Sequence, residues 1–396
     1  MAVARISKLE PVVTGFGVVS SIGIGAERFW RAVLAGETAA HPVRSFDPSP
    51  LRNTIACEID GFVPAAVDGC DEPPRASALG ICAAREALAT AGVDPAAVGA
   101  VCVGTTMGDL PTIESFFGAG EHPELVSRVT SRTLAERIAE ALRIAAPAFT
   151  MGTSCSAGNL AIFRGVDLIR TGRATTVLAG GSDAFSRLAF IGFTRMRAMA
   201  PARCTPFDQG RKGILLGEGA GFVVIESREW AERRGAPMYA MIAGCGLSCD
   251  AHHISTPAPY GRGAAAAMAA ALDDADIEPE QVDFVSAHGT GTIHNDAAEA
   301  AACTTVFGSH RPYVSSLKAL IGHTLGAASA IQAVACTLSL RDRRVVPAWN
   351  VTTPDPECAV ELPLPGRFEP KPVRVVMSNG LAFGGNNSCL VLCGIN

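Results

Sequence analysis

Four short segments of this 396-residue chain combine reactive side chains with glycine or other small residues. In the first, residues 152–158, Cys155 stands between an apolar run and a segment of helical spacing. We expect the unpaired N–H groups of the helix start to lower the pKa of this thiol and to favour the nucleophilic thiolate. A free cysteine is more often a small core residue. The small neighbours and the helix start favour the nucleophile for Cys155.

The second and third segments each contain a histidine. Residues 288–292 (HGTGT) directly follow an apolar run, with Glu299 a little further along the chain. Residues 315–328 contain Lys318 and His323 on an expected loop before a helix of small residues. An imidazole can donate or accept a proton near neutral pH, which suits general acid–base chemistry. Taken alone, either histidine could be structural, and a lysine is usually a solvated surface charge.

In the fourth segment, residues 378–387, Phe383 precedes a pair of glycines. It could be the core side chain of a hairpin or a hinged lid over a pocket, and spacing does not decide between them. Residues 15–20 (GFGVVS) lack the third glycine of a dinucleotide fingerprint, so we expect a tight turn there. The pairs Cys245/Cys249 and His252/His253 do not have a recognisable metal-site spacing.

The elements that position these segments follow from hydrophobic periodicity. Apolar runs rich in β-branched residues predict strands at 98–103, 174–179, 221–226, 282–287 and 373–377. Alanine-rich segments of helical spacing predict helices at 80–91, 157–170, 263–274 and 326–340. Alternating strands and helices predict an α/β layered fold with largely buried sheets. No apolar stretch approaches the ~20 residues of a membrane span.

An internal resemblance divides the chain into two similar parts. Residues 84–108 align without a gap with residues 268–292, and each segment reads as a helix, a turn with proline, a strand and a Gly/Thr loop. A weaker match follows, with a short strand and a helix that opens near 155 or 326. In a duplicated α/β protein the loops at the strand ends converge, so we expect the site at the junction of the halves.

Composition limits the class of function. The chain is 48% hydrophobic and 18% charged, with a formal net charge of −5, so we expect a well-buried globule without the basic excess needed for nucleic acid. Its 13 cysteines form no CxxC pair, and the first ten residues contain no secretory signal. We therefore expect reduced thiols and a cytoplasmic location.

Taken in order, these segments resemble the β-ketoacyl-[acyl-carrier-protein] synthases of the elongating (KAS I/II-like) type, in the thiolase superfamily. The likeness also includes residues 12–20, 205–208 (TPFD), 216–221 (LGEGAG) and 250–254. The resemblance implies a five-layered α-β-α-β-α sandwich of two similar halves. We expect residues 1–245 to form the half with the nucleophile and residues 246–396 the half with both histidines.

The resemblance also implies the roles of single residues. Cys155 would be the nucleophile, and His288 and His323 the catalytic histidines, supported by Lys318 and Glu299 as a charged pair. The pantetheine arm would contact Thr290, Thr292 and Ser255, Phe383 would be the gate and oxyanion residue, and Met107 would line the acyl pocket.

The implied reaction is a decarboxylative condensation of an acyl group held on Cys155 with malonyl-carrier protein, in fatty-acid or polyketide biosynthesis. It needs no metal and no organic cofactor, because the phosphopantetheine belongs to the carrier. The implied partners are acyl carrier protein and a second copy of the chain, or a chain-length partner in a heterodimer.

Three alternatives stay open. The acyl group could pass from Cys155 to an amine or alcohol. A thiolase acting on CoA esters would use a second cysteine as base, with Cys389 or Cys393 as candidates, but would have one histidine where this chain has two. A non-catalytic partner subunit would lack the nucleophile, which is present here.

Overall fold

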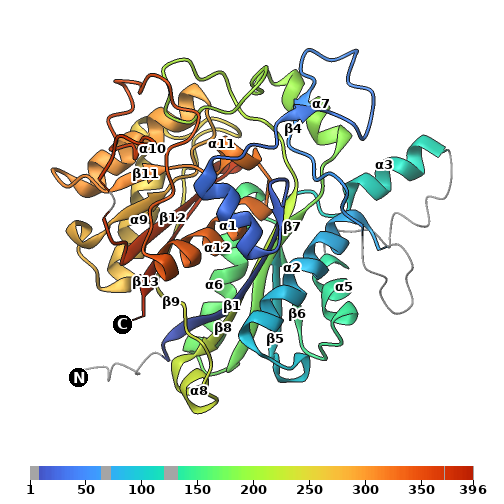
Figure 1. Ribbon diagram of the computed structural model, residues 1–396, viewed down its shortest axis with the longest axis vertical. Coiled ribbons are helices and arrows are strands. Elements are labelled where there is room, and N and C mark those ends of the chain that lie inside the picture. The colour runs from blue at the N-terminus through green and yellow to red at the C-terminus, as the bar shows by residue number, and fades with distance from the viewer. Residues whose placement is uncertain (1–8, 64–72, 120–132, 370, 396) are drawn as a thin grey trace.

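The computed structural model describes residues 9–63, 73–119, 133–369 and 371–395, and its main strands form two arrays of the same design (Figure 1). The first runs in the order β6-β5-β7-β8-β1 and the second in the order β11-β10-β12-β13-β9. Both share one pattern: β5 is parallel to β6 and β7, as β10 is to β11 and β12, and the remaining neighbours are antiparallel. The expected duplication of one α/β unit is confirmed.

The strands of the first array are β1 (Pro11–Ser20), β5 (Ala100–Gly104), β6 (Ala148–Met151), β7 (Thr176–Asp183) and β8 (Gly219–Ser227). Those of the second are β9 (Ala240–Cys249), β10 (Phe284–Ser286), β11 (Tyr313–Ser315), β12 (Val375–Leu381) and β13 (Asn386–Gly394). The arrays meet where β1 pairs with β9 at Val12 and Val13. They therefore form one continuous hydrogen-bonded sheet.

Helices separate and cover the two arrays. The outer helices are α2 (Arg75–Ala91) and α5 (Thr133–Ala141) on one side and α9 (Arg262–Ala275) and α10 (Ile293–Phe307) on the other, with α6 (Ala157–Arg170) and α12 (Ala327–Asp342) packed together in the middle. The largest hydrophobic cluster surrounds α6 and α12, and two further clusters lie beneath the outer helices. These are the expected five α-β-α-β-α layers. The predicted boundary between 245 and 246 falls inside β9 and stays a prediction.

The repeated segment predicted from the sequence is repeated in three dimensions. After α2 comes the short helix η1 (Pro95–Ala97) and then β5; after α9 comes η4 (Pro279–Gln281) and then β10. Each short helix begins at the proline and ends before a valine with nearly identical backbone angles, Val98 and Val282. The equivalent strands therefore deliver their following loops to equivalent places.

The expectation of a tight turn at residues 15–20 is wrong, because these residues belong to the buried strand β1. Gly15 and Gly17 are required by the helix above them: a Cβ would lie 2.3 Å from the carbonyl oxygen of Ala87 at Gly15 and 2.1 Å from that of Ala83 at Gly17. In the second half, Gly244 and Gly246 of β9 lie equally close to the α9 backbone. The glycines allow each outer helix to pack directly on the first strand of its half.

The remaining elements are connecting pieces. They are β2 (Gly23–Ile24), α1 (Ala26–Ala35), β3 (His41–Pro42), β4 (Ile55–Ala56), α3 (Leu110–Ala119), η2 (Ser154–Ser156), α7 (Arg187–Arg195), α8 (Arg228–Arg233), η3 (Pro259–Gly261), α11 (Lys318–Ile321) and η5 (Phe383–Gly385). Among the helices in the described ranges, none has both the length and the hydropathy of a bilayer-spanning segment.

Candidate active site

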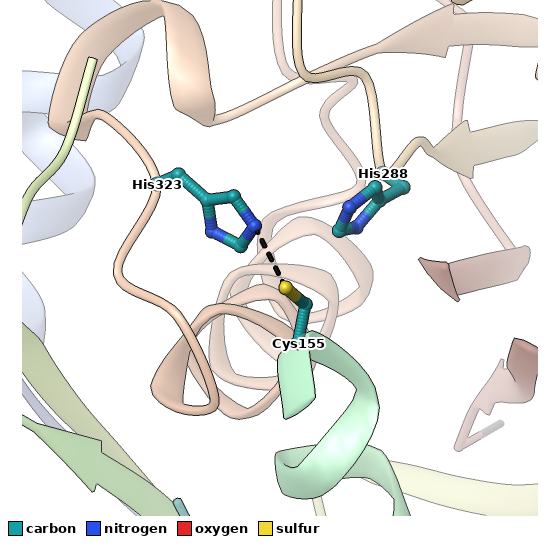
Figure 2. A group of neighbouring side chains, drawn as sticks. All are labelled: Cys155, His288 and His323. Atoms are coloured by element: carbon teal, nitrogen blue, oxygen red, sulfur yellow. Dashed lines mark hydrogen bonds between the residues drawn. The ribbon is translucent and has the colours of Figure 1, made fainter. Parts of the chain in front are cut away.

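The thiol of Cys155 lies where the two halves meet, facing two imidazole rings (Figure 2). Cys155 belongs to η2, the single turn that leads from β6 into the central helix α6, and is 6% exposed. His288 follows β10 and His323 follows α11, so both come from the second half. The Cys155 Sγ lies 3.1 Å from His323 Nε2, and the two rings meet edge to face at 5.3 Å. The three residues predicted to do the chemistry are thus brought together.

Backbone contacts fix both the place and the protonation of His323. Its N–H donates to Leu215 O at 2.7 Å and its carbonyl accepts from Gly217 N at 3.0 Å, which ties the histidine to the first half. The Leu325 N–H donates to His323 Nδ1 at 3.2 Å. An imidazole nitrogen that accepts a hydrogen bond carries no proton, so in the neutral ring the proton is on Nε2. His323 therefore offers an N–H donor toward the thiol.

Lys318 has the equivalent effect on His288. The Lys318 Nζ donates to the His288 carbonyl at 2.6 Å and lies 3.4 Å from His288 Nδ1. An ammonium has only donors, so it stabilises the tautomer with a lone pair on Nδ1 and the proton on Nε2. Burial lowers the pKa of both histidines well below the usual value, and the Lys318 charge lowers them further. Both rings are neutral near pH 7.

Glu299 and Lys318, which the resemblance implied to be a supporting charged pair, both lie beside His288 and interact through their charges. In the described part of the chain, Glu299 is fully buried and accepts the N–H groups of His288 and Gly289 at 2.8 Å each and the Asn379 side chain at 3.0 Å. It reaches Lys318 only through space, where its charge raises the lysine pKa against the effect of burial, leaving it at about 8. Glu299 accepts the backbone N–H of His288, whereas Lys318 contacts its carbonyl oxygen and its ring.

The expectation of a lowered thiol pKa is wrong for the structure as it stands. Burial raises the pKa of Cys155 to about 11, and the Lys318 charge and the backbone N–H groups of Phe383 and Cys155 oppose it only in part. A buried thiolate loses its hydration, and the partial positive charge at a helix start does not compensate for that loss. Desolvation therefore has the larger effect on the pKa of the thiol. Cys155 is a neutral thiol at rest, with two backbone amides already directed at it.

A cavity of about 530 Å³ opens onto this centre. Thr290, Thr292 and Ser255 line it, and the hydroxyls of Thr290 and Thr292 lie 2.9 Å apart. Their contact with a pantetheine arm stays a prediction. Thr292 is also the cap residue that begins α10, accepting the Asn295 N–H. Two exposed cations, Arg197 and Lys212, line the same cavity.

A second cavity of about 290 Å³ also reaches Cys155. Met107 lines it together with apolar residues of α7, and its role in an acyl pocket stays a prediction. Phe383 and Phe193 line both cavities, and their rings stack at 5.8 Å with 25° between their planes. Phe383 is therefore an exposed side chain between the cavities, and its predicted opening and closing stays a prediction.

Asp183, at the end of β7, is a site residue that the sequence analysis missed. It is fully buried, and its oxygens accept the N–H groups of Thr106, Met107 and Gly108, and that of Gly326 at 2.7 Å. One carboxylate thus holds both the loop that contributes Met107 to the second cavity and the start of α12. The signal in the sequence was a lone acidic residue directly after the apolar run of β7.

Gln332 of α12 was missed as well. It is 2% exposed, and its amide contacts Lys318 and the backbone behind His288. A single amide within an otherwise apolar helix was the signal available.

The same three catalytic candidates have the spacing of a metal site. Cys155, His288 and His323 offer ligand atoms within 4.8 Å of one another. A metal-binding imidazole uses the lone pair of one nitrogen and donates a proton from the other, usually to an oxygen. Here the Leu325 N–H and the Lys318 ammonium occupy the Nδ1 atoms as donors and leave the protons on Nε2. The donor set suits hydrogen bonding to a substrate oxygen better than metal ligation.

Comparison with protein families gave two matches that together cover most of the chain. The family model described as "Beta-ketoacyl synthase, N-terminal domain" matches residues 10–231, and the one described as "Beta-ketoacyl synthase, C-terminal domain" matches residues 239–352.

Individual relatives match nearly end to end. "Nodulation protein E" from Rhizobium meliloti (strain 1021) is 36% identical over 395 residues, covering 96% of this chain and 98% of the relative. "3-oxoacyl-[acyl-carrier-protein] synthase 2" from Staphylococcus aureus (strain MRSA252) is 34% identical over 405 residues, covering 97% and 98%. A solved structure described as "The ishigamide ketosynthase/chain length factor" has a TM-score of 0.93 at 39% identity, covering 98% of this chain and 100% of that one.

Proposed function

Because this chain belongs to the β-ketoacyl synthase family and is a ketosynthase, an acyl-transferring enzyme, we propose that Cys155, His288 and His323 carry out its condensation reaction. The observation that carries the proposal is the convergence of one thiol and two neutral imidazoles, each with a proton on Nε2, at the meeting point of two cavities. One cavity suits the arm that delivers substrate, and the other suits the acyl chain that stays on sulfur.

In the first stage the Cys155 sulfur attacks the carbonyl of an acyl thioester. The backbone N–H groups of Cys155 and Phe383, already directed at the thiol, are the donors for the tetrahedral oxyanion. The carrier thiol leaves and takes up the proton that Cys155 loses, so acyl-Cys155 and a free carrier thiol are formed. The Lys318 charge favours this step because it stabilises the thiolate.

In the second stage a malonyl thioester occupies the larger cavity. His288 and His323 donate their Nε2 protons as hydrogen bonds to its thioester carbonyl and stabilise the enolate formed as CO₂ leaves. The carbanion attacks the acyl-Cys155 carbonyl, and the sulfur departs to leave a β-ketoacyl thioester two carbons longer. Neutral donors suit this step, because a buried imidazolium would be costly to desolvate.

An acyl carrier protein is the proposed deliverer of both thioesters. Its phosphopantetheine arm would pass Thr290, Thr292 and Ser255, and the exposed cations Arg197 and Lys212 would favour an acidic carrier at the same cavity. The name of the Staphylococcus aureus relative includes acyl carrier protein as its substrate carrier. No resident metal or organic cofactor enters the proposed reaction.

The enzyme is proposed to work as a dimer in the cytoplasm. The strand β6 ends the sheet and its four residues are only half buried, which suits an edge extended by a second chain. The partner would be a second copy or a chain-length subunit, such as the chain length factor that accompanies the ishigamide ketosynthase.

The cysteines of the described residues are free thiols, as expected of a reducing compartment.

Intact-protein mass spectrometry tests the proposed function. After incubation with a panel of acyl-carrier thioesters, the wild type should gain the mass of one acyl group, and malonyl-carrier protein should remove it with release of CO₂. Cys155→Ala should gain nothing, whereas Cys102→Ala, a matched loss of a buried thiol on β5, should behave as wild type. An equal mass gain on Cys155→Ala, or no gain on wild type with any member of the panel, would contradict the proposal.

A further inference from the structure

The side-chain amide of Gln332 is buried beside the site, and the proposed reaction gives it no function. Its Nε2 lies 3.2 Å from each of three backbone carbonyl oxygens, those of Ser286, Ala287 and Asn379. These oxygens can only accept hydrogen bonds, so the amide nitrogen must point toward them. The amide oxygen is thereby turned to Lys318, whose Nζ donates to it at 3.3 Å.

The three acceptors around the Lys318 ammonium are all uncharged. They are the Gln332 oxygen at 3.3 Å, the His288 carbonyl at 2.6 Å and the His288 Nδ1 at 3.4 Å. An ammonium has three protons, so this set accounts for all of them. The group is held in one position, but no acceptor that it contacts cancels its charge.

We propose that Gln332 is a positioning residue that holds Lys318 against His288 Nδ1 and, because it is a neutral amide, leaves the Lys318 charge free to act on Cys155 and His288. This inference deepens the proposed condensation and rests on it. A carboxylate at position 332 would hold the same lysine but would cancel much of its field. A side chain without polar atoms would leave the electric field of Lys318 unchanged but would no longer hold its ammonium in place.

Other charged and titratable groups also act on Cys155 and Lys318. They are the same in the wild type and in variants at position 332. Lys318 has the largest charge effect that favours the Cys155 thiolate, and with a pKa of about 8 it is mostly protonated near pH 7. The groups that face Lys318 or Cys155 from the packed elements are Glu299 and Asp296 of α10, Asp183 of β7, Cys204, His288 and His323.

Two substitutions separate the charge of residue 332 from its shape. Gln332→Glu adds a negative charge, and Gln332→Met keeps the length without charge or hydrogen bonds. Gln209→Glu, at an exposed position, is the matched control for adding one charge. The readout is the rate at which iodoacetamide alkylates Cys155 at pH 7, where Lys318 is mostly protonated, followed by the mass of the peptide that contains it. This needs no acyl substrate, so its result is independent of whether condensation occurs.

At pH 7 we expect Gln332→Glu to lower the alkylation rate of Cys155 by about tenfold, the effect of raising the pKa of a mostly protonated thiol by about one unit. Gln332→Met should keep the wild-type alkylation rate but lower condensation by about fivefold to tenfold, the effect of one lost hydrogen bond. Gln209→Glu should change neither.

An unchanged alkylation rate at pH 7 in folded Gln332→Glu overturns the proposal, and so does an equal loss of rate in Gln332→Met, because a purely structural residue would act through shape. If circular dichroism shows that Gln332→Glu does not fold, Gln332→Met decides: an unchanged alkylation rate with slower condensation supports the proposal, and any other result overturns it. Loss of condensation in the wild type would instead contradict the proposed function.

Discussion

The two halves solve the same local problem with different residues. In each half, a buried carboxylate accepts backbone N–H groups of one loop. That loop follows the middle one of the three parallel strands. In the first half Asp183, from the end of β7, holds the loop with Met107; in the second half Glu299, from α10, holds the loop with His288. The first loop forms a wall of the smaller cavity, and the second carries His288, which lines the larger one.

The difference teaches where the chemistry of a duplicated fold resides. Strand order, strand directions and the glycine-dependent helix packing are repeated. The loops that precede the central helices are not: Cys155 precedes α6, and the equivalent loop before α12 carries His323. Shared architecture thus brings different side chains to symmetric places, where they face one another.

The largest expected effect on activity comes from removing the imidazole of His288, which belongs to the second half. His288→Ala should lower the condensation rate by about 10²–10³-fold, because a preorganised donor to a developing oxyanion contributes on the order of 3–4 kcal/mol. Loading of Cys155 should be retained in part, since its oxyanion donors are backbone groups. Product formation and acyl-enzyme mass, measured on the same sample, separate the two stages. The exposed His252→Ala is the control, and equal loss in both stages would contradict the division of labour.

The two carboxylates can be distinguished by pH. Burial raises the pKa of Asp183 from 3.8 to about 6, against the pull of its N–H donors. A group with a raised folded-state pKa contributes stability that is full below its unfolded pKa and is lost as pH rises through the folded one. Relative to Asp183→Asn, the free energy of unfolding of the wild type should therefore fall by at most about 3 kcal/mol between about pH 4 and pH 6.5.

Urea unfolding of both proteins across that pH range measures this fall. Asp296, whose pKa burial also raises to about 6, is present in both and cancels. A difference that stays constant or grows with pH would mean that Asp183 is ionised throughout.

Replacing each carboxylate by its amide sharpens the comparison further. Asp183→Asn and Glu299→Gln should each cost about 2 kcal/mol of unfolding free energy, because an NH₂ group then faces backbone N–H donors. Only Glu299→Gln should also slow decarboxylation of malonyl thioester by the unloaded enzyme, since only Glu299 holds His288. Denaturation curves and CO₂ release give the two readouts, and equal slowing of decarboxylation in both variants would break the distinction between the loops.

The smallest effect is expected at the wall of the acyl cavity. Met107→Ala should enlarge the cavity and change the ratio of long-chain to short-chain loading by about tenfold, in the range that apolar pockets achieve per missing group. Loading rates with acyl thioesters of increasing length measure it. Met241→Ala, on β9 and outside both cavities, should leave the ratio unchanged. A uniform loss at every length would mean that Met107 supports the loop rather than selecting the chain.

Much of this architecture could be predicted because its signals are local. The spacing of apolar residues that predicts a strand or a helix lies within one short segment. The repeat is visible when residues 84–108 are aligned with residues 268–292. Cys155, His288 and His323 could be nominated because each stands among glycines or small residues next to a strand or helix end. Residues 15–20 were predicted wrongly because the reason for their glycines is the backbone of α2, which lies in a distant part of the sequence.

The properties of the site that could not be predicted depend on contacts between the halves. The high pKa of Cys155 results from burial by both halves, and a helix start alone suggests the opposite. The tautomer of His323 depends on the N–H of Leu325, a residue with φ of +52° that no sequence pattern marks. Asp183 and Gln332 act through backbone groups of other elements, so their own neighbours in the sequence reveal little.

The contact between Cys155 and His323 has a consequence for how the chain folds during synthesis. The two residues are 168 positions apart, and contacts so distant in sequence form late, after the local units have folded. The ribosome releases the half with the thiol first, so a nascent or truncated chain has a cysteine without its partner rings. Cys155 can thus become a working nucleophile only when the second half has docked. Because burial by both halves raises the pKa of this thiol, a fall in its reactivity toward a thiol reagent would report completed folding.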